Sequence, residues 1–253
     1  MKRLLTAFVA IGALTAMAGV ALAGETVRIA TEGAYPPFNA KNEKGELIGF
    51  DVDIAKALCA AMKAECTIVA QDWDGIIPGL LARKYDAVVA SMSITPERRK
   101  KVSFTNKYYD TPLRYVSRKG TGIEISKAGL KGKNVGAQRA TTGADHAEQN
   151  FGGVASVKLY DTYDNALADL VAGRVDTVAA DGIPLSTWLA SAEGKNFELV
   201  GPPIKVDEGI GIAIRKEDSV LLGKMNAAIA KIRADGTYQK INAKYFPFDI
   251  YGN

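Results

Sequence analysis

The chain alternates short apolar runs with segments whose apolar residues recur at the helical period. Helical stripes occur in 52–62, 166–171 and 222–232, and the second of these places Ala166, Leu170 and Val171 on one buried face. The apolar runs predict strands at 26–30, 66–70, 86–90, 134–137, 156–160, 177–180 and 209–214. Strands and helices in alternation predict an α/β fold in which helices pack on sheets.

Two segments of the chain, 73–91 and 163–181, align at an offset of 90 positions. The identical pairs are Asp74/Asp164, Leu80/Leu170, Ala82/Ala172, Asp86/Asp176, Val88/Val178 and Ala90/Ala180. Chance similarity between two helix–strand units is the alternative to a duplication. A duplication predicts two lobes. Because ligands of open α/β sheets bind beyond the carboxyl ends of strands, it places Ser91 and Asp181 on opposite walls of one cleft.

The first 23 residues have the three parts of a secretory signal peptide. Lys2 and Arg3 precede an apolar stretch over 4–20, which small residues at Ala21 and Ala23 follow. An uncleaved membrane anchor is the alternative, since about 20 residues can span a bilayer. The small residues favour cleavage after Ala23, and we therefore expect a chain that is exported to the periplasm.

Export bears on the two cysteines, Cys59 and Cys66, which are seven positions apart. An oxidising compartment favours a disulfide between them. A reactive thiol pair is the alternative, but the Cys-x-x-Cys spacing typical of such pairs is missing. We expect a structural disulfide.

The composition of the chain narrows the classes of function that we expect. The formal charge is +4, and it is close to neutral once Lys2 and Arg3 are removed with the leader. No run of basic residues interleaved with aromatic ones is present, so we expect no nucleic-acid partner. One histidine, His146, and two cysteines argue against a metal site, and we expect neither a metal nor another cofactor.

The sequence SMSITPERR at 91–99 predicts an anion site. Thr95 is a good helix N-cap, the following proline suits the first turn, and Arg98 then lies at the third helical position. Free helix amides, the hydroxyls of Ser91 and Ser93, and a guanidinium together suit a carboxylate. A capped surface helix with solvated arginines is the alternative.

Further candidates lie at the ends of other predicted strands. Thr141 and Thr142 begin a helix and offer donors to the same anion, while Asp181 can accept from an ammonium group. In the loop after the first strand, Glu32 supplies a negative charge. Tyr35 and Trp73 supply flat faces that suit a cation, although core packing is the alternative for these rings. The combination suits an α-amino acid with a cationic side chain.

Nine segments follow one another in a characteristic order: TVRIATEGAYPPF, ELIGFDVDIAKALC, DWDGIIPGL, YDAVVASMSITPERR, FTNKYY, LKGKNVGAQRATT, AGRVDTVAAD, GIGIAIRKED and DGTYQKINAKYF. They resemble the polar amino-acid branch of the type II periplasmic solute-binding proteins, in particular its lysine/arginine/ornithine- and histidine-binding members. The resemblance covers essentially the whole chain after the leader.

This resemblance implies a two-lobed α/β fold with a hinge of two crossing strands and a ligand cleft between the lobes. Lobe 1 would comprise 24–112 and 210–253, and lobe 2 would comprise 113–209. The lobes would close around a ligand, and an inner-membrane ABC permease would recognise the closed form. We expect a monomer.

The resemblance also implies the role of each site residue. It assigns the ligand α-carboxylate to Ser91, Ser93, Arg98, Thr141 and Thr142, the α-ammonium to Asp181, the side chain to Tyr35 and Trp73, and its cationic end to Glu32 and the backbone of Ala90. Three residues depart from the family pattern: Glu32 replaces the usual aspartate, Gln138 a usual apolar residue and Trp73 a common phenylalanine. Arginine, lysine, ornithine and histidine are the first ligand candidates, and an opine or arginine derivative is the alternative.

An exported enzyme of the cyclohexadienyl dehydratase type is a rival on the same scaffold. Glu32 and Asp181 could supply an acid or a base. A pair of rings beside Glu32, however, suits a cation better than a dianion. We expect a binding protein with no catalytic residue, in which His146 is a solvated helix residue.

Overall fold

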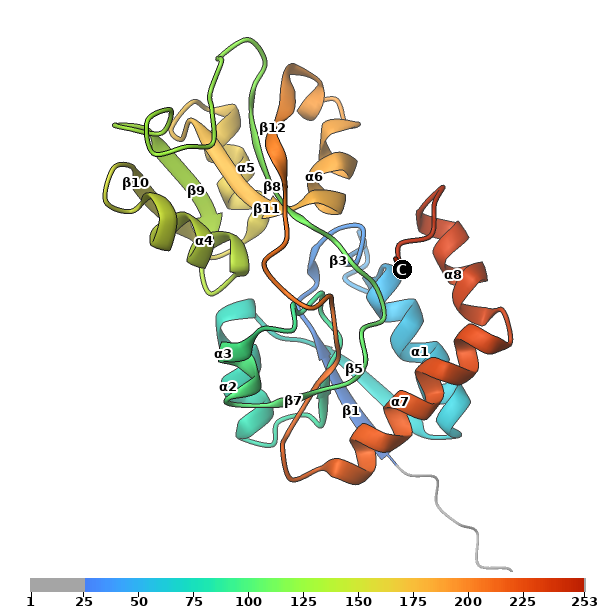
Figure 1. Ribbon diagram of the computed structural model, residues 1–253. Coiled ribbons are helices and arrows are strands. Elements are labelled where there is room, and N and C mark those ends of the chain that lie inside the picture. The colour runs from blue at the N-terminus through green and yellow to red at the C-terminus, as the bar shows by residue number, and fades with distance from the viewer. Residues whose placement is uncertain (1–25, 253) are drawn as a thin grey trace, which may run out of the picture.

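Two five-stranded sheets form the cores of two α/β lobes (Figure 1). The computed structural model describes residues 26–252, so the expected signal peptide lies outside the described residues. In lobe 1 the strand order is β5-β1-β6-β13-β7, and in lobe 2 it is β10-β9-β11-β8-β12. The predicted α/β class and the two-lobed architecture are confirmed.

The elements of lobe 1 come from both ends of the chain. Its main sheet consists of β1 (Thr26–Thr31), β5 (Glu65–Ala70), β6 (Ala87–Val88), β7 (Ser103–Phe104) and β13 (Ala213–Ile214). A small sheet consists of β2 (Ala34–Tyr35), β3 (Asn39–Lys41) and β4 (Leu47–Ile48). The helices are α1 (Phe50–Met62), the 3-10 turn η1 (Trp73–Gly75), α2 (Ile76–Leu81), α3 (Pro96–Arg99), α7 (Ser219–Ala234) and α8 (Thr237–Tyr245).

Lobe 2 is built from one continuous stretch. Its strands are β8 (Leu113–Arg118), β9 (Asn134–Gln138), β10 (Ser156–Tyr160), β11 (Thr177–Asp181) and β12 (Phe197–Ile204). Its helices are α4 (Thr142–Phe151), α5 (Tyr163–Val171), α6 (Gly182–Leu189) and the 3-10 turn η2 (Gly194–Asn196).

Both lobes repeat one unit, in which three parallel strands take the order second-first-third and an antiparallel strand follows. The shared aspartates explain part of the sequence repeat. The carboxylate of Asp86 accepts from the backbone N–H of Arg28 at 3.0 Å, and that of Asp176 accepts from Asn134 at 2.8 Å. Each aspartate thereby ties the start of the third strand to the first strand of its lobe.

Some predicted strands and one predicted buried stripe are longer than those in the structure. The runs at 86–90 and 209–214 contribute only two paired residues each to the sheet, because the carboxyl end of the first run and the amino end of the second lie outside the sheet. Val171 does not join the core stripe: it is 38% exposed at the carboxyl end of α5. The sequence pattern also missed β8 and β12, the antiparallel strands of lobe 2.

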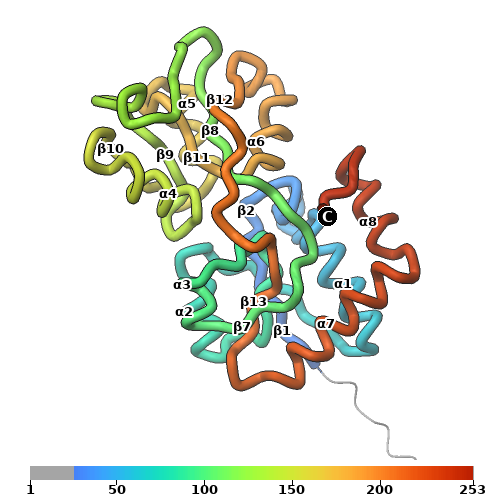
Figure 2. Tube along the Cα trace, in the orientation of Figure 1, coloured from blue at the N-terminus to red at the C-terminus, as the bar shows by residue number. Residues whose placement is uncertain are grey.

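Two segments cross between the lobes and run beside each other, as Figure 2 shows. Tyr109 and Ile210 form an isolated antiparallel bridge there, and the amide of Tyr108 donates to Ile210 at 2.9 Å. The chain then returns to lobe 1, where the carbonyl of Ile250 accepts from the amide of Asp110 at 2.8 Å. The carboxyl-terminal segment is thus bonded to one of the crossings.

Helix α1 is tied to the strand that follows it. Cys59 and Cys66 form a disulfide with an S–S distance of 2.03 Å, which confirms the predicted pairing. The helix starts after Gly49, whose φ is 123°, and a Cβ there would lie 2.3 Å from the carbonyl oxygen of Phe38. Glycine is therefore required at this turn.

Within residues 26–252, no helix is long and apolar enough to span a membrane.

Candidate ligand-binding site

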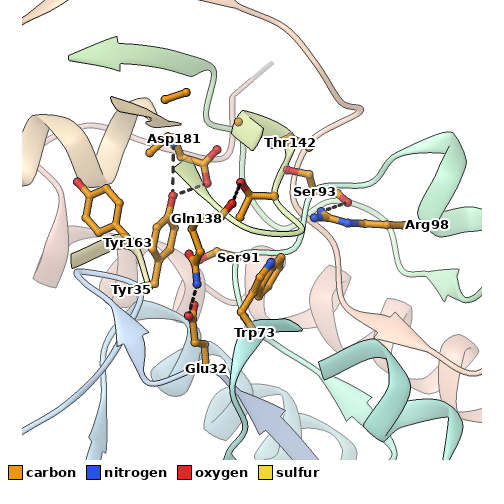
Figure 3. A pocket seen from close by; sticks show the side chains of 15 residues that line it. Glu32, Tyr35, Trp73, Ser91, Ser93, Arg98, Gln138, Thr142, Tyr163 and Asp181 are labelled. Atoms are coloured by element: carbon orange, nitrogen blue, oxygen red, sulfur yellow. Dashed lines mark hydrogen bonds between the residues drawn. The ribbon is translucent and has the colours of Figure 1, made fainter. Parts of the chain in front are cut away.

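A cavity with about 460 Å³ of space between atoms lies where the lobes meet (Figure 3). All eleven predicted contact residues line it: Glu32, Tyr35, Trp73, Ala90, Ser91, Ser93, Arg98, Gln138, Thr141, Thr142 and Asp181. Gly143, Tyr163, Ala179 and Ala180 line it as well and were not predicted. Tyr163 could have been found, since it is the counterpart of Trp73 at the 90-residue offset.

The lobe 1 wall carries the guanidinium of Arg98. The hydroxyl of Thr95 accepts from the Arg98 amide at 3.2 Å and so caps α3 as predicted. The guanidinium donates at 3.0 Å to the carbonyl of Ser93 and at 3.0 Å to that of Ala140. Burial lowers the pKa of Arg98, while nearby carboxylates raise it. Arginine stays charged at neutral pH, so a positive charge faces the cavity.

The lobe 2 wall is the start of helix α4. The Thr141 hydroxyl accepts from the Ala144 amide at 3.2 Å and donates to the Gln138 carbonyl at 2.7 Å. Its proton is therefore committed to the Gln138 carbonyl. The amides of Thr142 and Gly143 lie in the first turn, where an α-helix offers them no partner. A Cβ on Gly143 would lie 2.8 Å from the Ala179 carbonyl oxygen, so glycine lets the helix start approach β11.

Asp181 ends strand β11 and supplies a negative charge. Its side chain makes no cap bond to the following helix. Instead, Oδ2 accepts from the Tyr35 hydroxyl of lobe 1 at 2.9 Å. The pKa of Asp181 is raised to about 7 by the balance of four effects: burial and Asp207 raise it, and the Tyr35 hydrogen bond and Arg98 lower it. A cation beside this carboxyl would favour its charged form.

Glu32 supplies a second buried carboxyl. It follows β1, is 8% exposed, and accepts from Nε2 of Gln138 at 2.6 Å. The pKa of Glu32 is raised to about 7, mainly by burial; the Gln138 bond opposes this rise, and the charges of Asp164 and Asp72 add to it. Figure 3 shows Glu32 and Gln138 between the rings of Tyr35 and Trp73.

The aromatic side chains already have partners. The edge of Tyr35 meets Tyr163, with ring centroids 5.2 Å apart. The guanidinium of Arg98 lies 5.3 Å from the centroid of the Trp73 ring, and Nε1 of Trp73 donates to the Ala140 carbonyl at 3.0 Å. Ala140 thus accepts from two lobe 1 side chains, a role that the sequence did not indicate.

Hydrogen bonds made by side chains therefore join the lobes around the cavity: Tyr35 to Asp181, Gln138 to Glu32, and both Trp73 and Arg98 to Ala140. Each joins a lobe 1 residue to a lobe 2 residue at least 42 positions away. The arrangement is the closed one, in which the walls of the cleft are in contact.

His146 lies on helix α4 and is half-buried, so it is less solvated than we expected. Its Nδ1 lies 2.8 Å from the Tyr115 hydroxyl, and its ring packs against Phe151. The histidine is thus part of the packing of α4 on lobe 2, and burial lowers its pKa. Across residues 26–252, no group of three or more histidine, cysteine or acidic residues is arranged to hold a metal ion.

Two α/β lobes, joined by two crossing segments and closed on a cavity with charges of both signs, define a two-lobed binding protein for small molecules. The chain belongs to the bacterial extracellular solute-binding proteins, family 3, whose pattern matches residues 27–248. The resemblance found in the sequence is thereby confirmed.

Relatives of known identity agree with this assignment. An L-arginine-binding protein of Pseudomonas aeruginosa is 48% identical over 238 residues, which cover 91% of this chain and 92% of that protein. A histidine-binding periplasmic protein of Salmonella typhimurium is 40% identical and covers 94% of each chain. The solved structure of an ancestral arginine-binding protein bound to arginine is 37% identical with a TM-score of 0.83, and the match covers 88% of this chain and 99% of that one. These relatives are binding proteins, and the curated names support a periplasmic location.

Proposed function

We propose that this protein binds a basic L-amino acid, namely arginine, lysine, ornithine or histidine, in the periplasm and delivers it to an ABC permease. One observation carries the proposal: a single closed cavity holds Glu32, Asp181 and Arg98. In Figure 3 Glu32 lies apart from Asp181 and Arg98. That separation suits a zwitterion with a second cationic group on its side chain.

The charges of the cavity support this choice of ligand. Burying a carboxylate is costly unless a cation accompanies it. Burial raises the pKa of both Glu32 and Asp181 to about 7, which expresses that cost. An α-ammonium group at Asp181 and a side-chain cation at Glu32 would compensate both charges, with help from the carbonyl of Ala90. The α-carboxylate would pair with Arg98 and the first amides of α4.

Export, oligomeric state, lobe movement and the kind of activity complete the proposal. Residues 1–23 would be removed after export, and the mature protein would act as a monomer without a cofactor. Segments 24–112 and 210–253 would move against 113–209 about the two crossings. Binding and release, rather than catalysis, would be its activity, because the cavity carboxyls are placed to compensate charge and the relatives named above are binding proteins.

Calorimetry on mature protein that has been unfolded and refolded tests the proposal, since refolding removes any copurified ligand. We expect saturable binding of at least one of L-arginine, L-lysine, L-ornithine and L-histidine with a dissociation constant in the micromolar range or below, that is about −8 kcal/mol or better. L-glutamine serves as the neutral control of similar size, and octopine tests the opine alternative. Binding of octopine alone, or of no amino acid, would overturn the proposal.

A further inference from the structure

A fully buried carboxyl lies behind the cavity wall and is not used by the binding mode above. Asp51, in the first turn of α1, is 0% exposed. Its Oδ1 accepts from the Tyr108 hydroxyl at 2.7 Å. Its Oδ2 accepts from Nδ2 of Asn39 and from the hydroxyl of Ser91, each at 2.9 Å. Among these partners, only Ser91 also lines the cavity.

The direction of each bond follows from its partners. Oδ1 of Asn39 accepts from the Gly33 amide at 2.8 Å, so the NH₂ group of Asn39 faces Asp51. Burial raises the pKa of Asp51, and the donors of Tyr108, Asn39 and Ser91 lower it. A carboxylate surrounded by donors can only accept. The single hydroxyl proton of Ser91 therefore points at Asp51.

The direction of this hydrogen bond decides what the Ser91 hydroxyl can offer to a ligand in the cavity. Ser91 has a φ of 52°, a left-handed conformation that is uncommon for a residue with a side chain. With its proton directed to Asp51, the Ser91 hydroxyl has no proton left to donate to a ligand and can only accept. Such an oxygen attracts an ammonium group and repels a carboxylate.

We propose that Asp51 is a positioning residue that makes the Ser91 hydroxyl an acceptor for the α-ammonium of the ligand. The inference rests on the proposed function and deepens it. It moves Ser91 from the carboxylate contacts implied by the family resemblance to the ammonium contacts, beside Asp181. The α-carboxylate is then left to Ser93, Arg98 and the start of α4.

Two analogues of arginine separate these roles. Agmatine lacks the α-carboxylate, and 5-guanidinopentanoate lacks the α-amino group. Calorimetry on Ser91→Ala should show about tenfold weaker binding of L-arginine and agmatine, and binding of 5-guanidinopentanoate unchanged within about twofold. Asp51→Ala should show the same pattern. The double variant should bind the ligands no more weakly than either single variant, because both changes remove the same contact, the Ser91 hydroxyl held by Asp51.

Asp53→Ala is the matched control, since Asp53 lies two positions along the same helix and is bonded to Lys244 and Tyr245 at its outer side. It should leave all three affinities unchanged. Equal losses for the three ligands with Asp51→Ala would mean a purely structural role and would overturn the positioning. If Asp51→Ala fails to fold, Ser91→Ala decides: weaker binding of 5-guanidinopentanoate with agmatine unaffected would overturn the inference. A wild-type protein that binds no ligand would instead contradict the proposed function.

Discussion

The hydroxyl of Tyr35 donates to Oδ2 of Asp181 across a distance of 2.9 Å and a separation of 146 residues. This bond joins the lobes and also stabilises the charged form of Asp181, which burial disfavours. Tyr35 is itself buried, and burial raises its pKa well above the ordinary value, so it remains a donor at neutral pH. The tyrosine thus prepares Asp181 to accept an ammonium group.

The first prediction is that Tyr35→Phe weakens arginine binding most at low pH. Without the phenolic donor, the pKa of Asp181 rises further above about 7, and more of the carboxyl is protonated at pH 6 to 7. We expect a loss of about tenfold at pH 6.5 that shrinks toward pH 9. Calorimetry across this range measures it. Tyr160→Phe, which removes a hydroxyl bonded to Asp169 outside the cavity, should show no such trend. A pH-independent loss would contradict the argument.

The second prediction is that arginine binding releases protons near neutral pH. Both Glu32 and Asp181 have pKa values raised to about 7 by burial in the closed protein. A cation that binds to this closed form favours the charged carboxylates and lowers their pKa values, so protons leave on binding. The affinity should therefore rise with pH up to about 7 and level off above it. Heats measured in two buffers of different ionisation enthalpy give the proton count. Uptake of protons, or none released at pH 6.5, would contradict the assignment.

How far the sequence predicts this molecule depends on whether the signal is local. Strands β1, β5, β9, β10 and β11 coincide with short runs rich in apolar residues, and the sequence predicts all five. Strands β8 and β12 pair with partners far along the chain, and β12 contains the irregular Gly201–Pro202–Pro203 stretch, so no local pattern marks them.

The residues of the site differ in the same way: some have a local sequence signal and others have none. Side chains at strand ends, such as Ser91 and Asp181, were found because their position along the chain determines their place in the fold. The Ala140 carbonyl, which accepts from Trp73 and Arg98, was missed because a backbone oxygen has no sequence signature. The bond between Asp51 and Ser91 was missed because it joins residues 40 positions apart.

The third prediction is that Arg98 and Glu32 contact opposite ends of the ligand. Arg98→Ala should weaken all α-amino acids alike, by about 2 to 3 kcal/mol, because it removes a charge-assisted contact to the shared carboxylate. Glu32→Gln should weaken arginine and lysine but not glutamine. Calorimetry with these three amino acids tests both variants. Arg99→Ala is the control for the first, since Arg99 pairs with Glu208 on the surface. Equal losses of glutamine and arginine binding with Glu32→Gln would refute the role of Glu32.

The fourth prediction concerns stability rather than binding. Replacing Cys59 and Cys66 by serine removes a loop closure of seven positions and should lower the free energy of unfolding by about 2 to 3 kcal/mol. Neither cysteine lines the cavity, so the affinity for arginine should not change. Urea denaturation and calorimetry on the same preparation measure both quantities. A loss of affinity in the folded double variant would show that the disulfide also positions the site.

The last prediction concerns the choice between arginine and lysine. Both amide hydrogens of Gln138 are committed, one to Glu32 at 2.6 Å and one to the Asp161 carbonyl at 3.1 Å. Its carbonyl oxygen is then left as an acceptor for the ligand. A guanidinium has five donors in a planar fork and can use Glu32 and Gln138 together, whereas an ammonium group is a point charge that Glu32 alone can pair.

Gln138→Leu should accordingly weaken arginine by about tenfold and lysine by no more than about twofold. Gln138→Glu is the complementary variant, which keeps an acceptor at this position and adds a charge that attracts both ligands. Competition calorimetry gives the ratio of the two affinities directly. If Gln138→Leu weakens lysine as much as arginine, Gln138 supports the fold of the wall without distinguishing the ligands. The replacement of an apolar residue by glutamine would then carry no information on specificity.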